Sequence, residues 1–267
     1  MSQEEDQQVL PSTTIHAKPL ATSLRISDLS FFCSVPRVRP FLVLRGCYSS
    51  RRWRRMGGSA VGSLLCLGDS YTIGEGLASA DTFPFLLRSF LMEKSLRSNE
   101  ELEVKVVAKT GWTTNELAEA IDAEKCSFKT QYDLVTLLIG VNNQYRGSEK
   151  GYDLGRYQAE FPPLLETAIT FAGMDSSKVR VVSIPDWGLT TFGQKSGRDS
   201  ALTSKELDEY NEFASELCKT KLVEFIDITT LSREVGPNPA YLVEDGLHYS
   251  KKFNEGIVEK LAATLTT

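Results

Sequence analysis

The sequence has few histidines and no clustered cysteines, and both shortages exclude classes of site. Its 267 residues include two histidines, so a histidine-rich metal centre is ruled out and any imidazole chemistry must use His16 or His248. The five cysteines are scattered, with no CxxC pair, which indicates neither a disulfide framework nor a cysteine-rich zinc site. A reducing, intracellular compartment fits this cysteine usage best.

Several nucleotide-binding and catalytic motifs are missing as well. GxxxxGK[ST] and HExxH do not occur, and the segment at residues 68–72 is not GxSxG, so P-loop, zincin and nucleophile-elbow chemistry are not indicated. Gly74-Glu75-Gly76 lacks the third glycine of a dinucleotide fingerprint. No stretch approaches the roughly 18 consecutive apolar residues of a membrane span. We therefore expect no metal, no cofactor and no transmembrane segment.

Charge divides the chain into two unequal parts. Residues 1–57 carry a net charge of +5 and are broken by four prolines, whereas residues 58–267 carry −10. We predict that the first part is a basic, disordered leader and the second a folded domain. Because nucleic-acid backbones are bound through clustered positive charge, the acidic domain argues against a nucleic-acid substrate.

Three interpretations of the leader stay open. After Asp6 it is rich in serine, threonine and arginine, the composition of a transit peptide for the chloroplast or mitochondrion. The acidic start at residues 4–6 argues against this interpretation, since such peptides avoid acids. Alternatively, Met56 is the functional start, or the leader is an extension without an address; both alternatives place the protein in the cytoplasm.

From residue 58 onward, strand and helix patterns alternate. Apolar runs predict five strands, at residues 61–67, 104–108, 134–141, 179–184 and 223–228. Amphipathic spacing and capping residues predict helices that open at Asp81 and at Thr113 or Thr114, and helices over residues 154–171, 203–217 and 251–265. Since parallel neighbouring strands need crossover connections, this alternation predicts an α/β domain with a parallel sheet and helices on both faces.

Small or polar residues follow the predicted strand ends, where open α/β sheets bind ligands. Ser70, Gly111 and Asn142 follow the first three strands, and Asp245 and His248 lie three residues apart before the last helix. A serine hydroxyl needs a base such as His248 to take its proton, and a carboxylate fixes the imidazole tautomer. The Ser70 and Gly111 N–H groups and the Asn142 amide are candidate oxyanion donors. This set predicts a serine hydrolase with the catalytic residues Ser70, Asp245 and His248.

These residues stand in four blocks that resemble the SGNH hydrolases, also called GDSL-type esterases and lipases. The blocks are Gly68-Asp69-Ser70, Gly111, Gly140-Val141-Asn142 and Asp245-Gly246-Leu247-His248, in the family's order. Some stretches look especially like small bacterial-type acylhydrolases. Asn143 departs from the pattern, which usually has aspartate there, and we expect it to support its loop. The resemblance implies a flavodoxin-like three-layer α/β/α fold and hydrolysis of a small carboxylic ester or thioester through an acyl-enzyme, without metal.

The choice of substrate stays open. Trp112, Tyr145 and Trp187 follow strand-end motifs and are candidates to line the substrate site, the alternative being that they pack loops. A further hypothesis is that Arg146 meets an anionic leaving group. We expect Asp69 to hold its turn rather than to act as a catalytic acid. Two other functions also stay open, namely acyl transfer to an alcohol or sugar, and a catalytically silent binding or scaffold protein.

Overall fold

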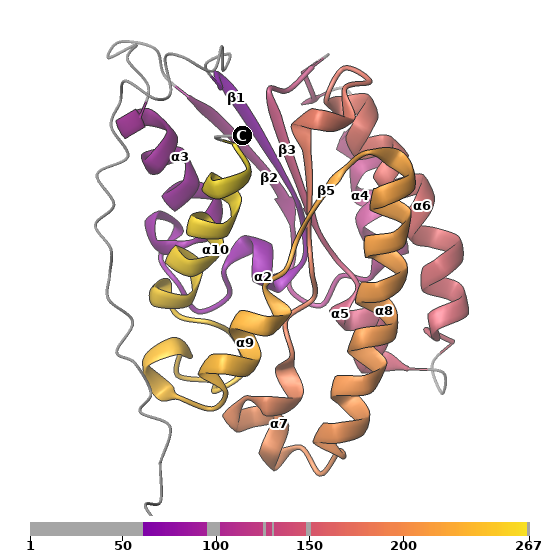
Figure 1. Cartoon of the computed structure of the whole chain (residues 1–267), viewed down its shortest axis with the longest axis vertical. Helices are drawn as coiled ribbons and strands as arrows, with labels where there is room; N and C mark the ends of the chain where they lie inside the picture. The colour runs from indigo at the N-terminus through magenta and orange to yellow at the C-terminus, as the bar shows by residue number, and fades with distance from the viewer. Residues whose placement is uncertain (1–60, 95–101, 125–126, 130, 148–150, 266–267) are drawn as a thin grey trace, which may run out of the picture. The chain divides into compact units, whose positions relative to one another are not determined.

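The described part of the chain folds around one five-stranded parallel sheet with helices on both faces (Figure 1). The computed structural model describes residues 61–94, 102–124, 127–129, 131–147 and 151–265. The predicted leader at residues 1–57 lies outside the described residues, so the leader and the domain boundary at residue 58 stay predictions. The predicted fold class, a flavodoxin-like three-layer α/β/α fold with a five-stranded parallel sheet, is confirmed.

The strands lie in the order β2-β1-β3-β4-β5, and every neighbouring pair is parallel. Their bounds are Ser63–Gly68 for β1, Glu103–Ala108 for β2, Leu134–Leu138 for β3, Val179–Val182 for β4 and Glu224–Ile226 for β5. The three central strands are buried along their whole length, as expected where helices cover both faces of a parallel sheet. Edge strand β2 is mostly half-buried.

Two groups of helices form the outer layers of the fold. On one face, α3 (Phe83–Lys94) packs against α10 (Lys251–Thr264); on the other, α6 (Leu154–Phe171) lies between α4 (Thr114–Glu124) and α8 (Ser200–Lys221). Four shorter helices follow the carboxyl ends of the strands, and the last two of them in chain order lie toward the lower end of Figure 1. These are α2 (Ser70–Ile73), α5 (Val141–Arg146), α7 (Thr191–Lys195) and α9 (Thr229–Val235).

The strand register brings the ends of β1, β2 and β3 level with one another. Gly68, the last residue of β1, pairs with Ala108 of β2 and with Leu138 of β3. The loops that follow these three strands therefore leave the sheet side by side. Because β2 lies on one side of β1 and β3 on the other, this edge is the topological switch point at which open α/β sheets bind ligands.

The predicted third strand is wrong at its C-terminal end. Residues 134–141 are predicted as one strand, but β3 ends at Leu138 and α5 begins at Val141. Gly140 separates the two with a φ of 125°, and a Cβ at this position would lie 2.7 Å from Tyr157 Cε2. The apolar run continues past the strand because Val141 is also buried, and periodicity alone does not distinguish these cases.

We predict that Gly68 tolerates no side chain. A Cβ there would overlap Thr72 Oγ1 and the Leu138 carbonyl oxygen, so the turn into α2 would have to move away from β3. Gly68→Ala should lower the free energy of unfolding by at least about 2 kcal/mol in urea denaturation. Gly62→Ala is the control, because its Cβ would meet its nearest neighbour at an ordinary 3.4 Å. Equal destabilisation by the two substitutions would contradict the prediction.

Candidate active site

Ser70 is the first residue of the short helix α2, directly after β1. Asp69 caps this helix, since its Oδ1 accepts a hydrogen bond from the Tyr71 N–H at 3.0 Å. The helix ends at Gly74, which has a φ of 76°. The first N–H groups of a helix have no acceptor within it, so the Ser70 N–H is available to a group beyond the strand end.

Asp245 and His248 form a hydrogen-bonded pair on the loop before α10. The Asp245 Oδ2 lies 2.6 Å from His248 Nδ1, while its Oδ1 accepts the backbone N–H groups of Leu247 at 2.7 Å and His248 at 2.9 Å. Partial burial acts to raise the pKa of Asp245, but these hydrogen bonds hold it below its ordinary value. Because an ionised carboxylate can only accept, this contact pairs Asp245 Oδ2 with a proton on His248 Nδ1.

A cavity of about 160 Å³ brings the predicted site residues together. Ser70 and His248 line it together with Gly111 and Asn142, although they come from four separate segments, namely α2, the loop before α10, the loop after β2 and α5. The remaining wall is mostly apolar and includes Val141, Tyr145, Trp187, Phe192 and Leu247. A serine hydroxyl, an imidazole and hydrogen-bond donors therefore share one cavity with an apolar surface.

Gly111 reaches the cavity from the loop after β2, and Asn142 reaches it from the first turn of α5. Gly111 has a φ of 85°, and a Cβ there would meet nothing within 4 Å, so open space lies beside its backbone. Asn142 Nδ2 donates one hydrogen bond to the Trp112 carbonyl at 2.9 Å, and its second N–H has no acceptor among the described residues. Asn143 is buried and bonds the Thr114 N–H and hydroxyl at 3.1 and 2.7 Å, which agrees with its expected role as a loop support.

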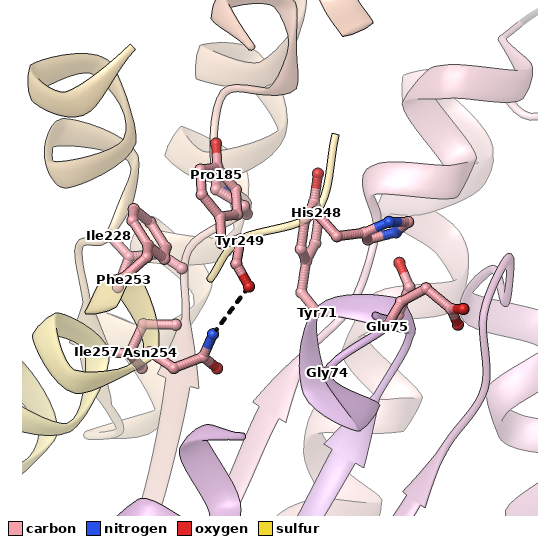
Figure 2. Close-up of a pocket in the computed structure, with 11 residues that line it drawn as sticks. Tyr71, Gly74, Glu75, Pro185, Ile228, His248, Tyr249, Phe253, Asn254 and Ile257 are labelled. Atoms are coloured by element: carbon pink, nitrogen blue, oxygen red, sulfur yellow. Dashed lines mark hydrogen bonds between the residues drawn. The ribbon is translucent and has the colours of Figure 1, made fainter. Parts of the chain in front are cut away.

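Tyr71 is a site residue that the sequence analysis misses. Figure 2 shows it between Tyr249 and His248, with ring centroids 5.6 Å and 5.7 Å away. It lines the cavity of Figure 2 and also the larger cavity beside Gly111. Burial, with nearby Tyr249 and carboxylates, raises the pKa of Tyr71 well above its ordinary value, so its phenol stays neutral. The one feature of the sequence that could have indicated Tyr71 as a cavity-lining residue is its position directly after Ser70.

The rest of the cavity wall combines predicted lining residues with two that were not predicted. Tyr145 and Trp187, two of the predicted lining residues, meet edge to face with centroids 5.2 Å apart. Phe192 comes from α7, which the sequence pattern does not predict, and Leu247 lies within the Asp245–His248 block. Arg198 covers the outer side of Tyr145, with its guanidinium carbon 4.8 Å from the ring centroid.

Trp112 and Arg146 do not line this cavity. The Trp112 ring packs against the hydrophobic core, and its carbonyl accepts from Asn142. Arg146 donates to the Gly111 carbonyl at 2.7 Å and pairs with Glu116 at 3.0 Å. These contacts place Arg146 beside the turn of Gly111, and the hypothesis that it meets an anionic leaving group stays a prediction.

The fold and the cavity define an α/β protein with a serine and a histidine–aspartate pair at the switch point of its sheet. The model of the GDSL-like Lipase/Acylhydrolase family matches residues 66–255. The chain belongs to this family, which confirms the resemblance predicted from the four motif blocks.

Solved structures share this fold at low sequence identity. TesA is 17% identical with a TM-score of 0.56, over 76% of this chain and 97% of that one. A lipase/acylhydrolase from Enterococcus faecalis is 20% identical with a TM-score of 0.56, over 76% and 95%. An acetyl xylan esterase variant from Geobacillus stearothermophilus is 21% identical with a TM-score of 0.57, over 78% and 95%. The comparison with curated proteins gave no match.

Two searches of the described residues were negative. In that part of the chain, no group of three or more histidine, cysteine, aspartate or glutamate side chains is placed to hold a metal ion. Within the same residues, no helix combines the length and the apolar character needed to cross a membrane.

Asp69 carries an unusual carboxyl group directly beside Ser70. It is fully buried, and its Oδ2 has no hydrogen-bond partner among the described residues. Burial raises the pKa of Asp69 to about 7, although the hydrogen bond from the Tyr71 N–H acts to lower it. The folded chain therefore holds a proton on Asp69 at pH values where an exposed aspartate has lost it.

We predict that Asp69 makes the fold less stable as pH rises. The unfolded chain releases the Asp69 proton near pH 3.8 and the folded chain near pH 7. The stabilisation of the fold by protonated Asp69 is therefore complete below pH 4 and lost above pH 7. Across this range the free energy of unfolding should fall by on the order of 4 kcal/mol more in the natural chain than in Asp69→Asn. Urea denaturation at several pH values measures this difference, and identical slopes would contradict it.

Proposed function

We propose that this protein is a serine esterase or acylhydrolase that cleaves small carboxylic ester or thioester substrates through an acyl-enzyme. The observation that carries the proposal is the convergence of Ser70, the His248–Asp245 pair, Gly111 and Asn142 on one cavity. Membership of the GDSL-like Lipase/Acylhydrolase family supports the same chemistry.

In this proposal the first half of the reaction acylates Ser70. His248 Nε2 takes the hydroxyl proton as Ser70 Oγ attacks the acyl carbon, while Asp245 stabilises the resulting imidazolium. The oxyanion accepts hydrogen bonds from the Ser70 and Gly111 N–H groups and from Asn142 Nδ2. His248 then returns the proton to the leaving alcohol or thiol, and the bond to the leaving group breaks.

The second half of the reaction releases the acid. A water molecule gives its proton to His248 and attacks the acyl carbon, and the same donors hold the new oxyanion. When this intermediate collapses, Ser70 Oγ leaves with the proton that His248 held. The cycle consumes one water and restores the enzyme, and every proton transfer in it uses His248.

The apolar wall of the cavity supports a hydrocarbon acyl group as the part of the substrate bound there. Trp187, Phe192 and Leu247 offer it carbon surface and no charge. A cavity of about 150 Å³ accommodates a benzene ring, so the volume here of about 160 Å³ suits an acyl chain of up to about six carbons. We therefore propose short-chain acyl esters and thioesters as the substrate class.

Replacement of the nucleophile tests the proposed chemistry. Purified full-length chain should hydrolyse p-nitrophenyl acetate and butyrate, and Ser70→Ala should lower kcat/KM by at least about 10³-fold because no acyl-enzyme forms. Release of p-nitrophenolate measures the rate, and a neutral phosphonate ester should label the natural chain at Ser70 alone. A natural chain no faster than Ser70→Ala would exclude the esterase, and product analysis with an added alcohol would detect acyl transfer.

Removing a side chain from the cavity wall should allow the enzyme to accept longer acyl chains. Phe192→Ala removes a ring from the apolar wall, so kcat/KM for p-nitrophenyl octanoate should rise about tenfold relative to the acetate. Phe128→Ala is the matched control, because Phe128 is a half-buried ring that stacks on Phe171 and does not line the cavity. The same ratio of rates in both variants would exclude this cavity as the acyl site.

A further inference from the structure

The backbone turn that carries Gly111 is a type II turn, which has a type I alternative. Residues 109–112 form a β-turn closed by the hydrogen bond from the Trp112 N–H to the Lys109 carbonyl at 3.2 Å. Gly111 is its third residue with a φ of 85°, and Thr110 is not among the described residues with positive φ, which defines a type II turn. In the alternative type I turn the central peptide is turned over, and the Gly111 N–H points the other way.

Glycine leaves this turn free to change unless other groups restrain it. Glycine adopts positive and negative φ with similar free energy, and Gly111 has no side chain whose packing could fix its conformation. The Gly111 N–H also has no hydrogen-bond acceptor among the described residues. The direction of this donor therefore depends on the partners of the neighbouring backbone groups.

Arg146, the last residue of α5, binds the turn from outside. Its Nη2 donates to the Gly111 carbonyl at 2.7 Å and lies 3.0 Å from Glu116 Oε2, and its Nη1 donates to Glu116 Oε1 at 3.3 Å. Its guanidinium carbon also lies 5.0 Å from the centroid of the Tyr152 ring. Three different groups thus fix the guanidinium in the position where it holds Gly111.

Glu116 is itself held in place at the start of α4. It accepts hydrogen bonds from the Thr113 N–H at 2.8 Å and from the Thr113 hydroxyl at 2.9 Å. Partial burial acts to raise the pKa of Glu116, but these bonds and the charge of Arg146 hold it below its ordinary value. The carboxylate is therefore charged and fixed when it orients Arg146.

The rest of the turn is restrained in the same way. Asn142, on the first turn of α5, donates to the Trp112 carbonyl, the residue directly after Gly111. On the other side, the Thr110 hydroxyl donates to the Glu75 carboxylate from the loop after α2. These contacts hold the Thr110 side chain and the carbonyls of Gly111 and Trp112, so the turn is anchored on both sides of the peptide that carries the Gly111 N–H.

We propose that Arg146, oriented by Glu116, is a positioning residue that keeps the Gly111 N–H directed into the cavity as an oxyanion donor. The inference rests on the proposed esterase function and assigns Arg146 a role in it without substrate contact. We call the contact of the Arg146–Glu116 pair with the Gly111 carbonyl the clamp. Because the oxyanion develops in the transition state, the clamp contributes to kcat and leaves ground-state binding of the ester nearly unchanged.

Steady-state kinetics on p-nitrophenyl butyrate tests this role. Arg146→Ala should lower kcat by about 10- to 100-fold with KM within about threefold, and Arg146→Lys should lie between it and the natural chain. Asn142→Ala provides the reference for loss of one donor, about 10²- to 10³-fold. A loss that falls wholly on KM, or no loss in kcat, overturns the proposal.

Arg156 offers a matched control on the same aromatic ring. Its guanidinium carbon lies 4.1 Å from the Tyr152 centroid, and it bonds Glu160 at 2.6 Å and the Gly151 carbonyl at 3.1 Å. It therefore makes the same three kinds of contact, but with a glycine that does not line the cavity. Arg156→Ala should keep kcat within about threefold of the natural value. Equal losses in the two alanine variants would mean that the effect of Arg146 is general destabilisation.

Hydrogen exchange tests the clamp without catalysis. The Trp112 N–H closes the turn, so its protection should fall at least about tenfold in Arg146→Ala and stay unchanged in Arg156→Ala. Unchanged protection in Arg146→Ala overturns the clamp even in an active enzyme. Faster exchange in Arg146→Ala supports the role of Arg146 in holding the turn. If the natural chain then hydrolyses no ester, the proposed esterase function is excluded, while the structural role of Arg146 still stands.

Discussion

Close packing between the ends of β1 and β3 is the constraint on which the candidate site depends. Gly68 leaves no room for a Cβ between the turn into α2 and the Leu138 carbonyl. This contact holds Ser70 at the level where β3 ends and α5 begins. Because β2 ends at the same level, the loops of Gly111 and Asn142 reach Ser70 without long excursions. The positions of the site groups therefore follow from backbone packing more than from the choice of side-chain rotamers.

Much of the fold is predictable because its large elements bury wide apolar surfaces. Apolar runs predict all five strands to within a few residues, and helical spacing predicts α6 with its observed bounds. The short helices α2, α5, α7 and α9 are not predictable in this way, since four to seven residues do not display a period of 3.6. One wall of the cavity escapes prediction for this reason, because Phe192 lies on α7.

The motif blocks predict which loops meet, but not which side chains pair. Ser70, Gly111, Asn142 and His248 converge because strand order and register bring their loops together. The partner of Arg146 is Glu116, thirty positions away on another helix, and no local pattern encodes that contact. From the sequence alone, an arginine near the site can thus be predicted equally well to contact the substrate or to pair with another side chain of the protein.

Helix α5 holds the turn of Gly111 and also supplies a cavity residue, within six residues. Its first turn carries Asn142, and its last residue holds the turn of Gly111. Short helices open locally at a lower free energy than the sheet that supports them. One local opening of α5 would therefore release two of the three proposed oxyanion donors, Gly111 and Asn142, while the sheet and the His248–Asp245 pair stay folded. The temperature range of activity would then be set by this segment and would end below the melting temperature of the whole domain.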